Sequence, residues 1–452
     1  MFLPAAIQAA ASGKVHEFVL DNGLKLVIKE DHRAPVVASQ VWYKVGASYE
    51  PEGLTGLSHM LEHMMFKGTA RHGPGEFSRI IAENGGRENA FTGADYTAYF
   101  ENLERSRLAV AFELEADRMR NLRLEEQEFR KEKQVVLEER RLRTEDQPRA
   151  KAYEHFLATA YTNGPYRNPI IGWPADIEHL TLEDLKAWYQ RWYAPNNATL
   201  VVVGDVDPHQ TLKLAKRWFG KLKPSRIPPL KPRTEVEQVG ERRLTIRLPA
   251  EVPYLMMGYK VPSLASLPEE RRWEAYALTV LAGILDGGES ARLSSRLVRG
   301  RQIAASASAG YDLYDRLPTL FLFDATPAQG HTLAELEQSL REEVHKLQTE
   351  LVTSEELARV KTQVTAEAIY ERDSVFYQAM QIGLLETVGL GWQRMDEYAD
   401  RISQVSAEQV LEVARKYLIP ERLTVGHLEP LPIEKKKPKA EAQSELRSEY
   451  VR

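Results

Sequence analysis

The chain has 452 residues, 43% of them apolar, so it is long enough to form two or more domains with sizeable cores. Its 60 lysine and arginine residues against 65 acidic residues give a formal net charge of −5, which argues against nucleic-acid binding. Cysteine is absent, which excludes disulfides, thiolate metal sites and cysteine nucleophiles, and no run of about eighteen apolar residues predicts a membrane span.

The N-terminal segment, residues 1–14, begins MFLPAAIQAAAS, which is small and apolar but lacks the positively charged start of a secretion signal. We expect a signal remnant or a disordered N-terminus. A trimmed signal predicts a periplasmic protein, and a fraying terminus of a cytoplasmic protein is the alternative.

The pentapeptide His59-Met60-Leu61-Glu62-His63 is the most informative motif of the chain. Residues four apart on a helix lie about 5 to 6 Å apart on one face, a span that two Zn–N bonds of about 2.0 to 2.1 Å can close. His59 and His63 are therefore candidate ligands of one cation. Glu62 lies beside them and can take a proton from a bound water, which makes it a candidate general base. The alternative, a hydrogen-bonded core histidine or a surface ion pair, is disfavoured because three polar groups on an apolar helix need partners.

The motif is expected on one short helix, because good or tolerable helix formers surround it. Thr55 or Ser58 could cap the start of this helix, and Gly68 offers a left-handed stop.

A second helix is predicted over residues 124–143, which are rich in Glu, Lys, Arg and Leu. Spacings of three and four place Phe129, Glu132, Val136 and Glu139 on one inward stripe, whereas Glu138 falls on a polar stripe. Glu139 is therefore the candidate third ligand, with the fourth position left open for water as catalytic zinc requires. Glu132 suits an acceptor that orients a ligating imidazole, the alternative being a surface Glu paired with Arg or Lys.

An internal repeat divides the chain into two versions of one domain. Pro195 and Pro420 are offset by 225 positions, as are Thr199 and Thr424, in WYAPNNATLVVVGDVDP and KYLIPERLTVGHLEP. Each half alternates strand-like runs with long amphipathic helices, which predicts an α+β fold with a largely antiparallel sheet in each half. The segment 273–281, which corresponds to the motif helix, has no histidine, so we expect one zinc ion per chain.

The repeat and the composition predict five segments, which are an N-terminus (1–14), a zinc-binding domain (15–220), a Pro-rich linker (221–240), an inactive homologous domain (241–430) and a charged disordered tail (431–452).

The sequence resembles the pitrilysin, insulinase and mitochondrial-processing-peptidase family of zinc peptidases, whose signature is H-x-x-E-H. The resemblance covers most of the chain and includes GLSHMLEHMMFKGT, ENGGRENAFTGADYTAYF and VVLEERR. It implies His59, His63 and Glu139 as zinc ligands, Glu62 as base and Glu132 as the supporting acid. It also implies two domains that face each other across a chamber, and a zinc metalloendopeptidase that acts on peptides or unfolded polypeptides.

The segment Asn89-Ala90-Phe91-Thr92 follows a Gly-Gly turn and is predicted to be a strand. In the family the matching N-A-x-T segment is an edge strand beside the metal. The resemblance therefore implies that these four residues bind the peptide substrate as an added β-strand, whereas the sequence alone also fits an ordinary edge strand.

One departure from the family concerns an arginine and a following tyrosine of the second half, which reach the substrate in members that act alone. Arg292, Arg296 and Arg299 are available, but the tyrosine position aligns with Ala305. Some members work as unlike pairs, so we expect a dimer. An unlike family member that supplies the substrate-binding Arg and Tyr is the preferred partner, and a second copy of this chain is the alternative. The alternative function is a non-catalytic structural or peptide-binding subunit of a larger complex.

Overall fold

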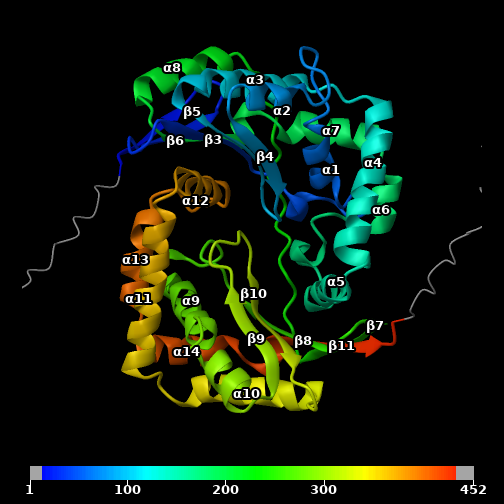
Figure 1. Cartoon of the computed structure of the whole chain (residues 1–452), viewed down its shortest axis with the longest axis vertical. Coiled ribbons are helices and arrows are strands. Elements are labelled where there is room, and N and C mark those ends of the chain that lie inside the picture. Colours follow the sequence, from blue (N-terminus) through cyan, green and yellow to red (C-terminus); the bar gives the residue numbers. More distant parts are fainter. Residues whose placement is uncertain (1–12, 434–452) are drawn as a thin grey trace, which may run out of the picture.

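The computed structural model describes residues 13–433, which form two β-sheets with helices packed around them (Figure 1). The α+β fold predicted from the sequence is confirmed. The predictions of a signal remnant and of a charged tail concern residues that lie, apart from 13–14 and 431–433, outside the described part.

The first sheet belongs to the N-terminal half and is antiparallel except where β2 pairs with β6. Its strands in spatial order are β1 (Val15–Val19), β2 (Lys25–Glu30), β6 (Ala198–Gly204), β3 (Val36–Tyr43), β5 (Thr97–Glu104) and β4 (Arg87–Thr92). The strand β4 is therefore at one edge and pairs with β5 alone.

The second sheet repeats this plan, with one parallel pair, β7 and β11, in an otherwise antiparallel sheet. Its strands in spatial order are β7 (Arg242–Pro249), β11 (Leu423–Leu431), β8 (Tyr254–Val261), β10 (Thr319–Pro327) and β9 (Ala304–Tyr311). In both halves the first long strand runs parallel to the last one, as a duplicated domain requires.

The helices of the first half are α1 (Leu57–Met64), α2 (Glu76–Glu83), α3 (Leu108–Asn121), α4 (Glu126–Arg140), α5 (Pro148–Ala160), α6 (Pro174–His179), α7 (Leu182–Trp192) and α8 (Pro208–Trp218). Those of the second half are α9 (Trp273–Asp286), α10 (Leu333–Thr349), α11 (Ser354–Glu371), α12 (Val375–Thr387), α13 (Arg394–Ser403) and α14 (Ala407–Tyr417). The Pro-rich linker carries neither helix nor strand between residues 223 and 239.

The repeat is visible in the way its helices begin. Thr181 caps α7 and Ser406 caps α14, each in a capping box with the residue three positions later, Asp184 or Gln409. Each box satisfies two backbone N–H groups that the first turn leaves without partners. The same local signal thus starts the equivalent helix in both halves.

The two halves exchange one helix each. The helix α5 leaves its own half and packs on β7, β8 and β11 of the second sheet, whereas α12 packs on β3 and β6 of the first sheet (Figure 1). The two helices are equivalent in the repeat, because Pro148 plus the offset of 225 falls at position 373, two residues before α12 begins. Two apolar clusters therefore join the halves in addition to the separate core of each half.

Glycines allow both exchanged helices to approach the sheets closely. A Cβ atom at Gly383 of α12 would lie 2.1 Å from the indole of Trp42, a fully buried residue of β3. On the other side, Phe156 of α5 fills the space above Gly258 and Gly426, where a Cβ atom would lie 2.9 Å from its ring. Close packing of an aromatic ring on a glycine thus fixes both contacts.

Gly383→Ala is expected to destabilise the protein by about 1 to 3 kcal/mol, because the added methyl group overpacks the contact with Trp42. Its backbone is helical, so conformational strain does not add to the effect. Chemical denaturation followed by tryptophan fluorescence measures the change. Gly310→Ala in β9 is the matched control, because no atom lies within 4 Å of a Cβ atom there. Equal stability of the two variants would contradict the packing.

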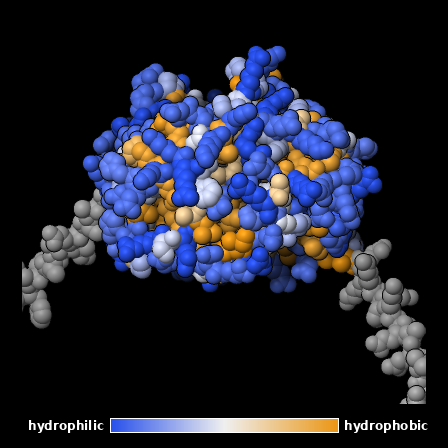
Figure 2. Space-filling model, turned by 90° about the horizontal axis from the view of Figure 1, so that it is seen from above, coloured by the Kyte–Doolittle hydropathy of each residue, from blue (hydrophilic) through white to orange (hydrophobic). Residues whose placement is uncertain are grey.

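Polar and charged side chains cover most of the face seen in Figure 2, with smaller apolar patches between them. Within residues 13–433, no helix is both long and apolar enough to cross a membrane.

Candidate metal centre

The helix α1 is held at its start by a glutamate that the sequence did not point to. Glu50 accepts hydrogen bonds from the backbone N–H groups of Gly56, at 2.8 Å, and Ser58, at 2.6 Å. The two predicted caps are wrong, because Thr55 donates to Asp176 instead and the N-cap position is Gly56, which has a φ of 85°. Glu50 thereby satisfies donors of the first turn.

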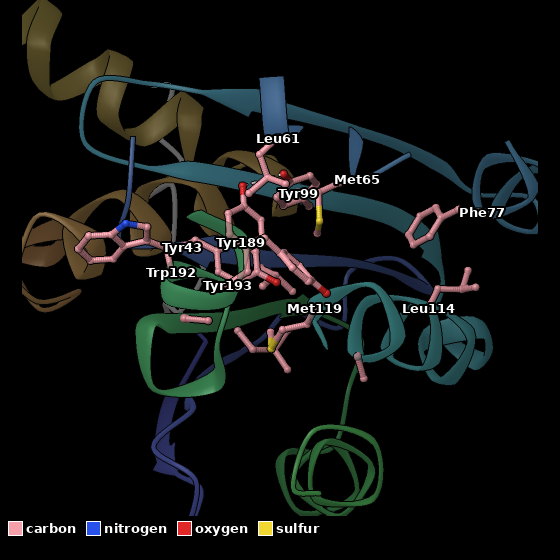
Figure 3. Packing of buried hydrophobic residues seen from close by; sticks show 14 of the residues in the cluster. Tyr43, Leu61, Met65, Phe77, Tyr99, Leu114, Met119, Tyr189, Trp192 and Tyr193 are labelled. Atoms are coloured by element: carbon pink, nitrogen blue, oxygen red, sulfur yellow. Dashed lines mark hydrogen bonds between the residues drawn. The ribbon is translucent and has the colours of Figure 1, made fainter. Parts of the chain in front are cut away.

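The end of α1 also differs from the expectation. The helix stops at Met64, four residues before Gly68, which adopts a left-handed φ of 99° in the following turn. One face of α1 enters the core, where Leu61 and, just after the helix, Met65 lie close to Tyr99 (Figure 3). The other face carries the two imidazoles and Glu62 toward a cavity.

The helix α4 brings Glu139 to the two imidazoles. Its Oε2 atom lies 3.6 Å from Nε2 of His59 and 3.2 Å from Nε2 of His63. Tetrahedral ligands at about 2.0 to 2.1 Å from zinc are about 3.3 Å apart, so these separations suit one ion. The neighbouring Glu138 points outward, with 55% of its side chain exposed against 17% for Glu139.

Both the separation of these donor atoms and an unsatisfied oxygen among them fit a divalent cation. Oε2 of Glu139 is buried and has no hydrogen-bond partner among the described residues, although it faces two ring nitrogens. His59, His63 and Glu139 are also the group of described residues whose ligand atoms all lie within 4.8 Å of one another. Two imidazoles and one carboxylate are the ligands of many catalytic zinc sites.

Three further side chains hold the candidate ligands in place. Nδ1 of His63 donates to Oε1 of Glu132 at 2.9 Å, which leaves Nε2 of that ring to face Glu139. Lys67 holds the other oxygen of Glu132 at 2.6 Å, and Arg143 holds Oε1 of Glu139 at 2.8 Å. The sequence indicated Glu132 but missed Lys67 and Arg143. Lys67 lies four residues after His63 and Arg143 lies four residues after Glu139, and this spacing was the available signal.

The electrostatic surroundings of the two histidines differ. Burial and the neighbouring His63 lower the pKa of His59 to about 4. Burial also acts to lower the pKa of His63, but hydrogen bonding to Glu132 and the charge of Glu139 outweigh it and raise this pKa to about 9. The negative charge that favours a proton on His63 favours a divalent cation in the same place.

Glu62 stands on the same face of α1 and is mostly buried. Its Oε2 atom accepts a hydrogen bond of 2.5 Å from Thr92 of β4. Burial raises the pKa of Glu62 above its usual value, against the effect of Thr92. A carboxyl group with a pKa nearer to neutrality is better matched to proton transfer.

These side chains line a cavity of about 1430 Å³ between the two halves. The four residues Asn89, Ala90, Phe91 and Thr92 of the edge strand β4 line it beside the imidazoles. Phe91 also packs edge-on against Trp42, 5.4 Å between ring centroids, so its ring belongs partly to the core. An edge strand with free backbone groups in a cavity can pair with an extended chain.

The arginines of the second half do not reach this cavity. Arg292 pairs with Glu356 at 2.8 Å, and Arg296 pairs with Glu343 at 2.7 Å, both within the second half. Neither of them, nor Arg299 or Ala305, lines the cavity. The second half contributes instead residues that the sequence did not indicate, which are Asp315, Thr319, Leu320 and Leu322.

Glu132→Ala is expected to weaken zinc binding by about 10- to 100-fold, because His63 loses the acceptor that orients its ring. Competition with a fluorescent chelator measures the affinity. Glu128→Ala on the same helix is the control, because Glu128 pairs with Lys131 at the surface. An unchanged affinity of the Glu132 variant would contradict the assigned role.

Two features together are typical of a metallopeptidase family. They are the duplicated α+β halves and the two histidines and one glutamate that meet on a cavity wall. The model of "Insulinase (Peptidase family M16)" matches residues 25–173, and that of "Peptidase M16 inactive domain" matches residues 179–364. The chain belongs to this family. Most of the match to the inactive domain falls on the second half, in which α9 carries no histidine.

Two curated relatives match nearly the whole chain. It is 33% identical to "Zinc protease PqqE" of Helicobacter pylori, over 95% of this chain and 96% of the relative, and 26% identical to "Uncharacterized zinc protease YmxG" of Bacillus subtilis, over 89% and 95%. The crystal structure of a protease from Helicobacter pylori superposes with a TM-score of 0.87 and 31% identity, covering 92% of this chain and 100% of that one.

Proposed function

We propose that this chain is a zinc metalloendopeptidase that hydrolyses peptide bonds in peptides or unfolded polypeptides. The observation that carries the proposal is the convergence of His59, His63 and Glu139 on one point, with Glu62 beside them, inside a cavity. One zinc ion per chain is proposed, because that group comes from the first half alone.

His59, His63 and Glu139 would hold the ion. Zinc bound there supplies a Lewis acid, which lowers the pKa of water and polarises the carbonyl group of a peptide bond. Glu62 accepts a proton from the attacking water and returns it to the leaving amine. Thr92 orients the carboxylate of Glu62 through its hydrogen bond.

The edge strand β4 would hold the substrate. Its backbone groups can pair with an extended peptide, which gives register with little dependence on side chains. Asn89, Ala90, Phe91 and Thr92 all line the cavity, so a peptide paired with them passes Glu62. The second half would cover one side of the cavity with Asp315, Thr319, Leu320 and Leu322, which would limit access of water and of folded proteins.

The decisive experiment is a peptidase assay on a peptide library with mass readout, with and without a chelator. We expect cleavage that the chelator abolishes and zinc restores. A zinc-loaded chain that binds peptides and leaves them intact would favour the alternative, a non-catalytic peptide-binding or structural subunit.

We also propose that the chain works as a dimer with an unlike family member that supplies an arginine and a tyrosine to the substrate. The observation behind this is that Arg292 and Arg296 are engaged in ion pairs away from the cavity. Addition of a co-encoded relative is expected to raise the cleavage rate. Equal rates with and without any such relative would contradict the pairing.

A periplasmic location is a further proposal, which rests on the composition of residues 1–12. Fractionation of cells that produce the full chain tests it, and recovery of the chain in the cytoplasm would contradict it.

A further inference from the structure

The second half presents one carboxylate to the cavity. Asp315 lies in the turn between β9 and β10 and lines the cavity together with Thr319, the first residue of β10. In the described part of the chain, no lysine, arginine or histidine forms an ion pair with it. The adjacent Arg316 turns away and binds Asp95 of the first half, with Nε 2.9 Å from Oδ1. Asp315 is thus an acid without a cationic partner.

Tyrosines of the first half line the same cavity as this carboxylate. Tyr153, Tyr161 and Tyr166 line the same cavity, and the charge of Asp315 contributes to the raised pKa of each, after burial, which is the main cause. The hydroxyl group of Tyr166 is engaged by Asp95. A carboxylate among aromatic rings is a suitable environment for a cation, because the faces of the rings also attract positive charge.

The absence of a partner has an energetic consequence for Asp315. Burial, followed by the charge of Asp312, raises the pKa of Asp315 to about 8. A carboxyl group in such surroundings either takes up a proton or pairs with a cation that enters the cavity. The neighbouring Asp312 does not line the cavity, and its carboxylate accepts a hydrogen bond from the backbone N–H of Tyr314 at 3.0 Å.

We propose that Asp315 is a specificity residue, whose carboxylate pairs with a positively charged nitrogen of the bound peptide. The nitrogen belongs to a lysine or arginine side chain or to the N-terminal ammonium group of the peptide. The proposal rests on the proposed peptide-binding function of the cavity. It assigns to the second half a part in substrate selection, although this half contributes no metal ligand.

The experiment compares the zinc-loaded full chain with its Asp315→Asn variant. One neutral, N-acetylated peptide is made in a series in which a single lysine replaces norleucine at successive positions. A further member of the series keeps norleucine throughout and has a free N-terminus. The ratio of kcat/KM between each charged peptide and the neutral one is the readout. Asp312→Asn is the comparison variant. Asparagine keeps the acceptor for Tyr314, and loss of the Asp312 charge favours the ionised form of Asp315, so the preference for charged peptides should persist.

We expect the wild-type chain and the Asp312 variant to prefer at least one charged peptide by about tenfold, which is a modest value for a partly desolvated charge pair. The Asp315 variant should lose this preference. A preference for lysine identifies a side chain as the cation, and one for the free N-terminus identifies the ammonium group. Equal ratios in the wild-type chain and the Asp315 variant would overturn the proposal.

A binding measurement separates this outcome from a failure of the proposed peptidase activity. Fluorescence anisotropy of the same peptides on the zinc-loaded Glu62→Gln chain, with and without Asp315→Asn, needs no cleavage. A preference for charged peptides that disappears with Asp315 supports the inference even if the chain proves inactive. Equal affinities for charged and neutral peptides overturn it even if the chain is an active peptidase.

Discussion

Glu62→Gln is expected to keep zinc bound and to lose about 10²- to 10⁴-fold in kcat, which is the usual contribution of a general acid and base. The amide has the same shape as the carboxylate and can still accept the hydrogen bond from Thr92. It cannot, however, take a proton from water at neutral pH. Single-turnover cleavage of a quenched fluorescent peptide measures the loss.

The interpretation of this result depends on the metal content. Zinc is quantified by mass spectrometry in the Glu62 variant, in the wild-type chain and in a control variant, Glu128→Gln. In the wild-type chain Glu128 lies on α4 and pairs with Lys131. We expect similar zinc in all three and a low rate in the Glu62 variant alone. An undiminished rate of that variant would reject Glu62 as the base.

Replacement of a ligand is expected to remove metal and activity together. His63→Ala and Glu139→Ala each delete an atom of the donor set, so their loss of zinc affinity should exceed the about 10- to 100-fold expected for a supporting residue. The Glu139 variant also leaves Arg143 without its partner at 2.8 Å.

Thermal unfolding gives a readout of this loss that is independent of catalysis. A ligand that binds only the folded state at about 100 times its Kd stabilises it by about 2.7 kcal/mol, so zinc should raise the Tm of the wild-type chain. This zinc-dependent rise in Tm should vanish in His63→Ala and in Glu139→Ala. It should persist in His155→Ala, which replaces an exposed histidine of α5. A zinc-dependent rise that persists in the ligand variants would contradict the site.

The sequence predicted the candidate site well where the question was which residues of one helix face inward. The separation of Glu139 from Glu138 follows from the spacing along α4, because helical geometry alone decides which of two adjacent residues faces inward. The place of Glu132, seven residues earlier on the same stripe, follows from the same rule. The predicted pairing of α1 with α4 rested on a carboxylate that faces inward and needs a partner, and the resemblance to a family implied the same residue. Spacing within a helix does not by itself indicate its neighbour.

Features that depend on contacts between distant segments were not predictable. Glu50 holds the start of α1 from a loop whose path local propensity does not fix, so the nearer hydroxyl groups of Thr55 and Ser58 were preferred. Asp315 was missed because its importance arises from the cavity that two halves form together. The exchange of α5 and α12 was missed because an apolar stripe shows that a helix is buried but not which sheet buries it.

The exchange of helices has a consequence for how a peptide would reach the candidate metal centre. If the linker alone joined the halves, they could rotate apart about it and admit a folded protein. Here α12 packs on Trp42 of the first sheet and α5 packs on Gly258 of the second. Separation of the halves would therefore expose two apolar clusters to water at once. We therefore expect the two halves to keep a nearly fixed separation, so that under the proposed function an extended chain could enter the cavity and a compact folded protein could not.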